Sequence, residues 1–159
     1  MNVRPRASGA RGGSLPIVLT GHPGVGGVAE GEALVSPDGF SARYDLDLTA
    51  GTISRESHAL YGQSLAARIF VCPTAKGGFA TAWALLNLRE RGRAPAAMLF
   101  GWANPVMVQG AVLAGIALMD RLTPDPMQVI HTGDRVRVDP KAGRVEVWPR
   151  AAERRGRPV

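Results

Sequence analysis

The stretch from Leu65 to Gly92 reads LAARIFVCPTAKGGFATAWALLNLRERG and contains a strand pattern, a glycine-rich turn and a helix pattern. The β-branched and aromatic run at 69–72 is followed by Pro73, which is typical of a buried strand that ends in a turn. Residues 79–91 are long enough for about three helical turns. The sequence therefore predicts a strand–turn–helix unit at the centre of the fold.

The turn of this unit predicts an anion-binding corner. A helix start leaves backbone N–H groups free and lies at the positive end of the helix dipole. Gly77 and Gly78 let a ligand approach the backbone closely, and Lys76 adds a positive charge. Two glycines before a helix are also common in plain turns, so a turn without a ligand stays open as the alternative. The spacing is not that of a Walker loop, because the lysine precedes the glycines.

The net charge of +6 is confined to the two ends of the chain. Residues 1–13 carry three arginines and residues 150–159 carry four against one glutamate, whereas residues 14–149 hold 12 basic and 12 acidic side chains. We expect disordered basic tails at both ends of a single domain at 14–149. Because this domain is neutral and the tails lack aromatic residues, nucleic-acid binding is not expected.

Cysteine content and hydropathy bound the cellular setting. Cys72 is the only cysteine, so the chain can form no internal disulfide and no cysteine cluster of its own. Its place in the central strand predicts a small buried side chain. No stretch approaches the roughly 20 apolar residues of a membrane span. We expect a cytoplasmic protein with no membrane partner.

The remaining patterns predict an α/β fold with parallel crossovers. Strands are expected at 32–35 and at 97–100, and the latter completes a strand–helix–strand crossover with the central unit. Asn104 as N-cap and Pro105 at the first helical position start a second helix, which leads to a short strand at 116–119. In open α/β sheets such helix starts gather at the carboxyl ends of the strands.

The C-terminal part predicts a β-hairpin. Apolar and polar residues alternate strictly at 135–139 and at 144–148, on either side of a turn that contains Pro140 and Gly143. The charged residues of both arms are expected on a solvated face. Near the N-terminus, residues 16–19 fit either an edge strand or an extended arm.

Three further expectations concern burial and the surroundings of the site. The helix at 79–91 is apolar on nearly every side, which predicts a buried helix with Trp83 in the core. Residues 40–47 fit either a half-exposed strand, in which Arg43 pairs with an aspartate, or a loop that lines the site. His58 is expected to be a structural histidine.

Several segments, in this order, resemble the swivel domain of aconitase X: EGEALVS, HALYGQSLAARIFV, AKGGFATAWALLNL, RGRAPAAMLF, NPVMVQGAVLAGI and TGDRVRVD. The resemblance covers roughly residues 29–139. It implies a swivelling β/β/α domain that forms the small subunit of a split dehydratase and docks onto a large subunit. It also implies an iron–sulfur or iron centre in that large subunit and no cofactor in this chain. The family dehydrates small hydroxy acids: cis-3-hydroxy-L-proline in bacteria and phosphorylated mevalonate in archaea.

The resemblance also implies site residues. In the family the central turn carries a lysine or arginine, a glycine, and then a serine thought to act as the catalytic base. Lys76 and Gly77 match this pattern, but Gly78 stands at the serine position. The catalytic residue therefore stays unknown, and the possible local substitutes are Ser64, Thr74 and Thr81. The expected substrate-binding residues are Lys76, Gly77, Gly78, Arg43 and Asn104, and no metal ligand is expected.

Two functions remain open from the sequence. The first is the small subunit of a hydro-lyase complex, inactive alone, whose loop holds a substrate carboxylate near a metal centre in the partner. The second is a non-catalytic binding or regulatory subunit, which the missing side chain at Gly78 favours.

Overall fold

The computed structural model of this protein describes residues 14–150, which form nine strands and four helices. The predicted basic tails, at 1–13 and 150–159, lie outside the described residues apart from Arg150. The strands are β1 (Ile17–Thr20), β2 (Ala29–Val35), β3 (Leu46–Asp47), β4 (Thr52–Ile53), β5 (Ile69–Thr74), β6 (Ala97–Trp102), β7 (Ala117–Asp120), β8 (Arg135–Asp139) and β9 (Arg144–Trp148). The helices are α1 (Ala42–Asp45), α2 (Phe79–Glu90), α3 (Pro105–Ala114) and α4 (Pro126–Val129).

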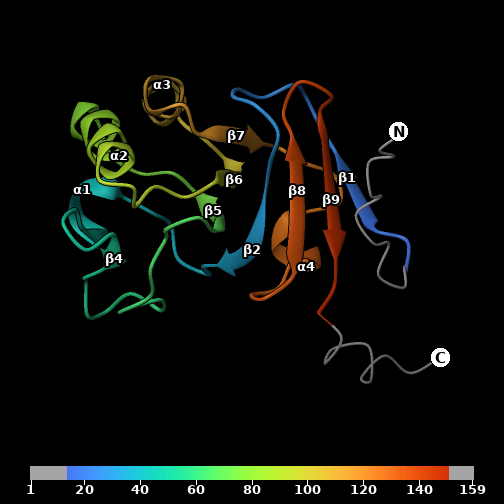
Figure 1. The fold of residues 1–159 in the computed structure, drawn as a ribbon, viewed down its shortest axis with the longest axis horizontal. Coiled ribbons are helices and arrows are strands. Elements are labelled where there is room, and N and C mark those ends of the chain that lie inside the picture. The colour runs from blue at the N-terminus through green and yellow to red at the C-terminus, as the bar shows by residue number, and fades with distance from the viewer. Residues whose placement is uncertain (1–13, 151–159) are drawn as a thin grey trace, which may run out of the picture.

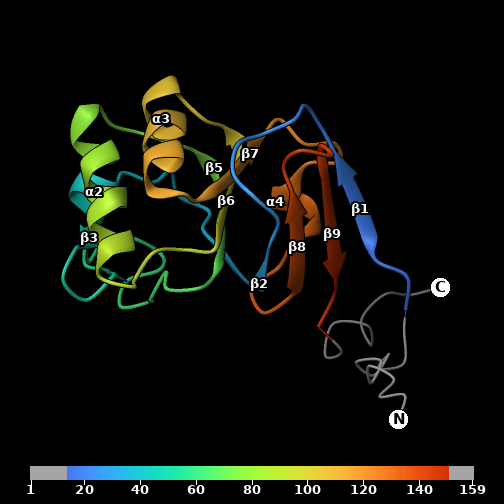
Figure 2. The same ribbon diagram turned by 45° about the horizontal axis from the view of Figure 1, so that its top comes forward.

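Seven of the strands form one sheet that is folded into two halves (Figure 1). Their order is β1-β9-β8-β2-β5-β6-β7. Strand β2 belongs to both halves, because residues 29–32 pair antiparallel with β8 and residues 33–35 pair parallel with β5. In Figure 2, α2 and α3 lie on one side of the parallel half, and β8, β9 and β1 lie on the other. The domain is thus built of three layers, and the predicted β/β/α fold is confirmed.

The parallel half contains both predicted crossovers, β5–α2–β6 and β6–α3–β7. One face of its strands packs under the two helices through side chains such as Phe70 and Phe100. The helices approach each other closely at Gly110, where a Cβ atom would lie 2.7 Å from the Cα atom of Ala82. This packing brings the start of α3 beside the residues that lead into α2.

The antiparallel half covers the opposite face of the parallel strands. Strands β8 and β9 have the bounds that the alternating pattern predicted, and β1 pairs with β9 at the edge of the sheet. The inward side of the hairpin is a row of four fully buried valines that pack against β5 and β6: Val136, Val138, Val145 and Val147. The charged residues of the hairpin lie outside this row.

The prediction that Trp83 belongs to the core is wrong. Its side chain is 70% exposed, and Phe79, one turn earlier on α2, is 77% exposed. Helix α2 buries only the side that carries residues such as Ala84, Leu85 and Leu88. Because alanine and leucine occur around the whole helix, its sequence contains no polar face from which the exposed side could be identified.

The segment at 40–47 is not a half-exposed strand. It forms the short helix α1, followed by β3, which pairs with β4. Local hydrogen bonds close this turn, because Ser41 N–H donates to Asp45 Oδ2 at 2.8 Å and Asp45 N–H donates to the Ser41 carbonyl oxygen. Arg43 is exposed over the ring of Tyr44, and the buried Asp45 pairs instead with Arg55, with 3.0 Å between Oδ1 and Nε.

Candidate functional site

The candidate site is the loop of residues 76–78, between the end of β5 and the start of α2. The backbone that leads into the loop is held from both sides. Lys76 N–H donates to the carbonyl oxygen of Phe40 at 2.7 Å, and Ala75 N–H donates to that of Trp102 at 3.2 Å. The chain therefore enters the loop in a fixed direction.

After Lys76 this hydrogen bonding stops. Within the described part of the chain, no hydrogen bond uses the backbone N–H groups of residues 77–80. Gly78 is the N-cap of α2 and has no side chain to satisfy them, and all four residues are exposed. Four consecutive donors on exposed residues thus have no acceptor at the positive end of a 12-residue helix. This arrangement suits an anion.

Gly77 can be replaced by no other residue without strain. Its φ angle of +110° is one that side chains disfavour. A Cβ atom here would also lie 2.5 Å from Thr81 Oγ1 and 3.4 Å from Ser41 Oγ. The loop therefore passes directly over two hydroxyl groups.

These two hydroxyl groups are buried and have no hydrogen-bond partner among the described residues. Thr81 is 1% exposed and Ser41 is 6% exposed. A buried hydroxyl without a partner costs roughly 1–3 kcal/mol, so most are satisfied in folded proteins. Their position under Gly77 makes them candidate functional groups of the loop.

The side chain of Lys76 lies along Gly39. A Cβ atom at Gly39 would lie 2.6 Å from Cε and 3.2 Å from Nζ of the lysine, so the glycine provides the space that the lysine occupies. No acidic side chain in the range 14–150 forms an ion pair with Lys76. Its charge is thus available to a ligand at the loop.

Asn104 holds the loop from the start of α3. Its Oδ1 accepts a hydrogen bond from Met107 N–H at 2.8 Å, as predicted for an N-cap. Its Nδ2 lies 3.4 Å from the carbonyl oxygens of both Ala75 and Gly77, to which it donates. Because an amide nitrogen carries two donors, this side chain is fully used in joining the two helix starts.

The other predicted site residues have local partners of their own. Arg43 lies on α1 with its guanidinium 5.2 Å from the centre of the Tyr44 ring. Ser64 Oγ accepts a hydrogen bond from Ala66 N–H, and the Thr74 hydroxyl donates to the Ala75 carbonyl oxygen. Of the three proposed substitutes for the family serine, only Thr81 places its hydroxyl under the loop.

Ser41 belongs to the segment 40–47, for which a loop that lines the site was one interpretation, but it was not among the predicted site residues. It occupies the N-cap position of α1, and the carboxylate of Asp45 holds its backbone. A serine that follows a Pro-Asp-Gly turn and precedes an aspartate by four residues signals a helix start. That signal places the serine locally, but it does not reveal which distant loop lies above it.

Two other polar groups near the helical layer have structural surroundings. His58 is 3% exposed, and its Nδ1 accepts a hydrogen bond from Leu60 N–H at 3.0 Å. Cys72 is fully buried, and burial raises the pKa of its thiol far above the usual range. The thiol stays protonated, so Cys72 is a buried apolar side chain rather than a nucleophile, as predicted.

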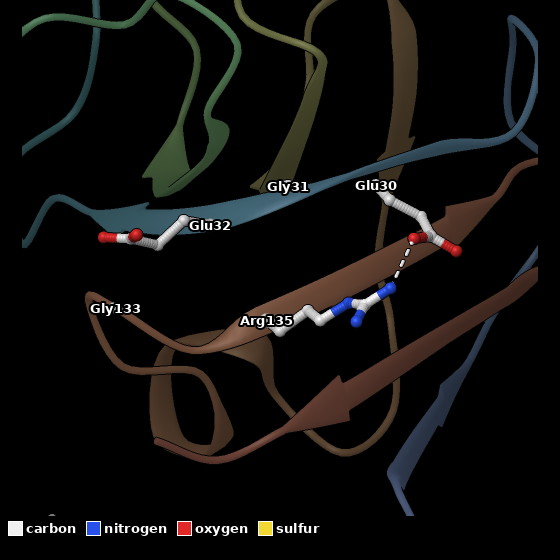
Figure 3. Close-up of a pocket in the computed structure, with 5 residues that line it drawn as sticks. All are labelled: Glu30, Gly31, Glu32, Gly133 and Arg135. Atoms are coloured by element: carbon white, nitrogen blue, oxygen red, sulfur yellow. Dashed lines mark hydrogen bonds and ion pairs between the residues drawn. The ribbon is translucent and has the colours of Figure 1, made fainter. Parts of the chain in front are cut away.

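A hollow of about 370 Å³ lies on the outer surface of the sheet, between β2 and the start of β8 (Figure 3). Its charged groups already pair with one another or with neighbours. Arg135 donates to Glu30 at 2.9 Å, and Glu32 lies 3.5 Å from Arg68. The hollow is therefore part of a solvated, ion-paired face and offers no free charge to a ligand.

The described residues contain no group of three histidine, cysteine, aspartate or glutamate side chains that could hold a metal ion. In the same range, no helix is both long and apolar enough to cross a membrane.

The fold and the loop together define a class of protein. It is a three-layer β/β/α domain with an open, glycine-rich helix start at the carboxyl end of its parallel strands. The chain belongs to the aconitase X swivel domain family, whose model matches residues 18–147.

Relatives of known name agree with this assignment. The phosphomevalonate dehydratase small subunit of Methanocella arvoryzae is 38% identical over 129 residues, which are 81% of this chain and 98% of that protein. The protein of the same name from Thermococcus kodakarensis is 33% identical over 81% of this chain and 95% of its own length.

Solved structures agree as well. A chain of the holo-form of Thermococcus kodakaraensis aconitase X matches with a TM-score of 0.78 and 32% identity, over 84% of this chain and 99% of that one. An NMR structure of a UPF0107 protein matches with a TM-score of 0.75 and 33% identity, over 84% of this chain and all of the other.

Proposed function

We propose that this chain is the small subunit of an aconitase X-type dehydratase and that its loop 76–78 holds an anionic group of a hydroxy-acid substrate. The observation that carries the proposal is the row of four unused backbone N–H groups at the start of α2, in the residues that directly follow Lys76. The small-subunit names of the relatives support it.

The donors at the loop suit a strongly charged group. Each hydrogen bond from an N–H group or an ammonium to an anion contributes about 1.5–3 kcal/mol, and the helix dipole acts in the same direction. A carboxylate offers two oxygens, whereas a phosphate offers three. The larger donor set and the relatives' names therefore favour a phosphorylated hydroxy acid such as phosphomevalonate over cis-3-hydroxy-L-proline.

A dehydration also needs a group that accepts a proton from carbon, and Gly78 has no side chain that can do so. We assign the role of the family serine to one of the two hydroxyl groups under the loop, that of Thr81 or that of Ser41. Both oxygens are covered by Gly77 in this structure, so their participation requires the loop to shift when substrate or partner binds. The left-handed Gly77 is the residue at which the backbone can turn most freely.

We place the iron–sulfur or iron centre of the reaction in the large subunit. The described residues of this chain provide no fitting set of ligands, so no step of the reaction is assigned to a metal held here.

The test is turnover by the assembled complex with phosphomevalonate and, separately, with cis-3-hydroxy-L-proline. We expect activity with the phosphorylated acid and none from the small subunit alone.

Lys76→Ala should lower kcat/KM about 10- to 150-fold, since it removes one charge-assisted hydrogen bond. Lys141→Ala is the matched control, because Lys141 is an exposed lysine in the hairpin turn. Turnover by this chain alone, or full activity of the Lys76→Ala complex, would overturn the proposal.

The second candidate function is a subunit that binds the same substrate without catalysing its dehydration, and it is favoured by the glycine at position 78. A complex that binds phosphomevalonate in a Lys76-dependent manner but does not turn it over would identify this function.

A further inference from the structure

We propose that the aromatic side chains around loop 76–78 form the surface on which the large subunit docks, with Phe79 and Trp83 as its anchors. The proposal rests on the proposed function, because that function requires a large subunit. The surface consists of four residues, which we call the aromatic rim: Tyr44, Phe79, Trp83 and Trp102.

The aromatic rim is exposed to an unusual degree for such large side chains. Phe79 is 77% exposed, Trp83 70%, Tyr44 67% and Trp102 51%. A single exposed apolar residue needs no explanation, but a group of them at one place marks an interaction surface. Aromatic side chains are also the residues that most often dominate the binding energy of interfaces.

The four residues come from three elements that meet at the loop. Phe79 directly follows Gly78, and Trp83 lies one turn further along the same side of α2. Trp102 pairs with Thr74 at the end of β5, and its carbonyl oxygen accepts from Ala75 N–H. Tyr44 lies on α1, which packs against α2 (Figure 1).

The large subunit is the occupant that the site itself requires. In the proposed function a metal centre must reach a substrate held at loop 76–78, and the described residues of this chain contain no group of three side chains that could hold a metal ion. A second protein must therefore close over the loop, and its surface must cover the residues that border the loop. Phe79, the residue immediately after Gly78, is the first of these.

The chain also provides a matched control surface. Val112 and Leu113, each 56% exposed, lie at the carboxyl end of α3, whose amino end meets the loop. A helix of 10 residues is about 15 Å long, so this pair lies well away from the loop. The two surfaces are alike in exposure and apolar character but differ in distance from the site.

The test measures the dissociation constant between the full-length chain and its large subunit, purified with its metal centre, by calorimetry. We expect Phe79→Ser and Trp83→Ser each to weaken binding roughly 30-fold, the loss typical of an interface anchor. The double variant Val112→Ser and Leu113→Ser should change binding less than about threefold. The melting temperature of each free variant checks that the fold is intact.

Unchanged binding of both rim variants, an equal loss in the control variant, or no binding by the wild-type pair would overturn the proposal. Self-association of the wild-type chain that the rim variants abolish, without an effect on the large subunit, would assign the surface to a second copy and also overturn it. The proposed function fails separately: tight wild-type docking that Phe79→Ser weakens, combined with no substrate binding or turnover, supports the docking surface alone.

Discussion

The starts of α2 and α3 occupy equivalent places in two consecutive crossovers, yet one is open and the other is closed. At α3, Asn104 caps the helix through Met107 N–H, and Pro105 has no N–H group to satisfy. At α2, the N-cap is Gly78, and the N–H groups of residues 77–80 have no acceptor among the described residues. Two neighbouring helix starts with the same topology therefore differ in chemistry because of the residue at the N-cap.

The closed start also supports the open one. The side-chain amide of Asn104 donates to the carbonyl oxygens of Ala75 and Gly77, which precede α2. The open loop is thus held from the side by an amide, and it lies over two hydroxyl groups that have no hydrogen-bond partner among the described residues. A loop with unused donors needs such support, because its own helix contributes only the hydrogen bond from Thr81 N–H to the Gly78 carbonyl oxygen at 2.9 Å.

The largest effect is expected at Gly77. Gly77→Ala introduces a Cβ atom 2.5 Å from Thr81 Oγ1 at a φ of +110°, so the loop must leave its position. Strain of this kind costs about 1–3 kcal/mol, and with the steric clash we expect kcat/KM of the complex to fall on the order of 100-fold.

Gly78→Ala is the control for this change, because a Cβ atom at Gly78 meets nothing within 4 Å and its φ is −117°. Its loss of activity should be smaller than that of Gly77→Ala, because the path of the backbone is kept. Equal losses in the two variants would show that the path of the backbone at Gly77 is not what the loop depends on.

The next effect separates the two roles of Asn104. Asn104→Ala removes the cap of α3 and should lower the free energy of unfolding by about 1–2 kcal/mol. Asn104→Ser keeps an acceptor at the N-cap but loses the donors to Ala75 and Gly77. It should therefore unfold close to the wild-type temperature while losing about 2- to 12-fold in kcat/KM, the value of one ordinary hydrogen bond. A serine variant that unfolds as early as the alanine variant would contradict this separation.

The closed start was easier to predict from sequence than the open one. Asn-Pro before an apolar run specifies a capped helix by itself, and the structure has the helix as predicted. The hairpin was equally predictable, because strict alternation fixes which side of each strand is buried. Both depend only on neighbours in sequence.

The open start depends on groups that are distant in sequence. Lys76, Gly77 and Gly78 indicate a turn with free donors, but the hydroxyl of Ser41 reaches the loop from another element. The exposure of Trp83 was equally hidden, because its helix is apolar on every side and only the packing of α2 against its neighbours decides which side is covered. The position of Ser41 under the loop and the exposure of Trp83 both depend on tertiary packing, which no local sequence pattern specifies.

A smaller effect, of opposite sign, is expected for Thr81. Thr81→Val replaces a buried hydroxyl that has no partner among the described residues with a methyl group of similar size. This should raise the free energy of unfolding by about 1 kcal/mol, because the cost of the unsatisfied group is removed. If the hydroxyl serves the reaction, kcat should fall in the same variant. Thermal unfolding of the free chain and turnover by the complex measure the two quantities, and a stabilised variant with full activity would remove Thr81 from the site.

The smallest effect on stability is expected from closing the open start. Gly78→Ser places at α2 the kind of N-cap side chain that Asn104 provides at α3, and it should stabilise the free chain by only a few tenths of a kcal/mol, because glycine is already tolerated at this position. The serine oxygen would take one of the donors that now face outward, so inorganic phosphate and substrate should bind about two- to fivefold more weakly. Amide chemical shifts of residues 77–80, titrated with phosphate, measure this directly.

If Thr81 or Ser41 supplies the catalytic hydroxyl group, Gly78→Ser should not raise turnover. A gain in turnover would instead show that position 78 lacks a catalytic group, in agreement with the non-catalytic alternative. It would also contradict the assignment of the catalytic hydroxyl to Thr81 or Ser41.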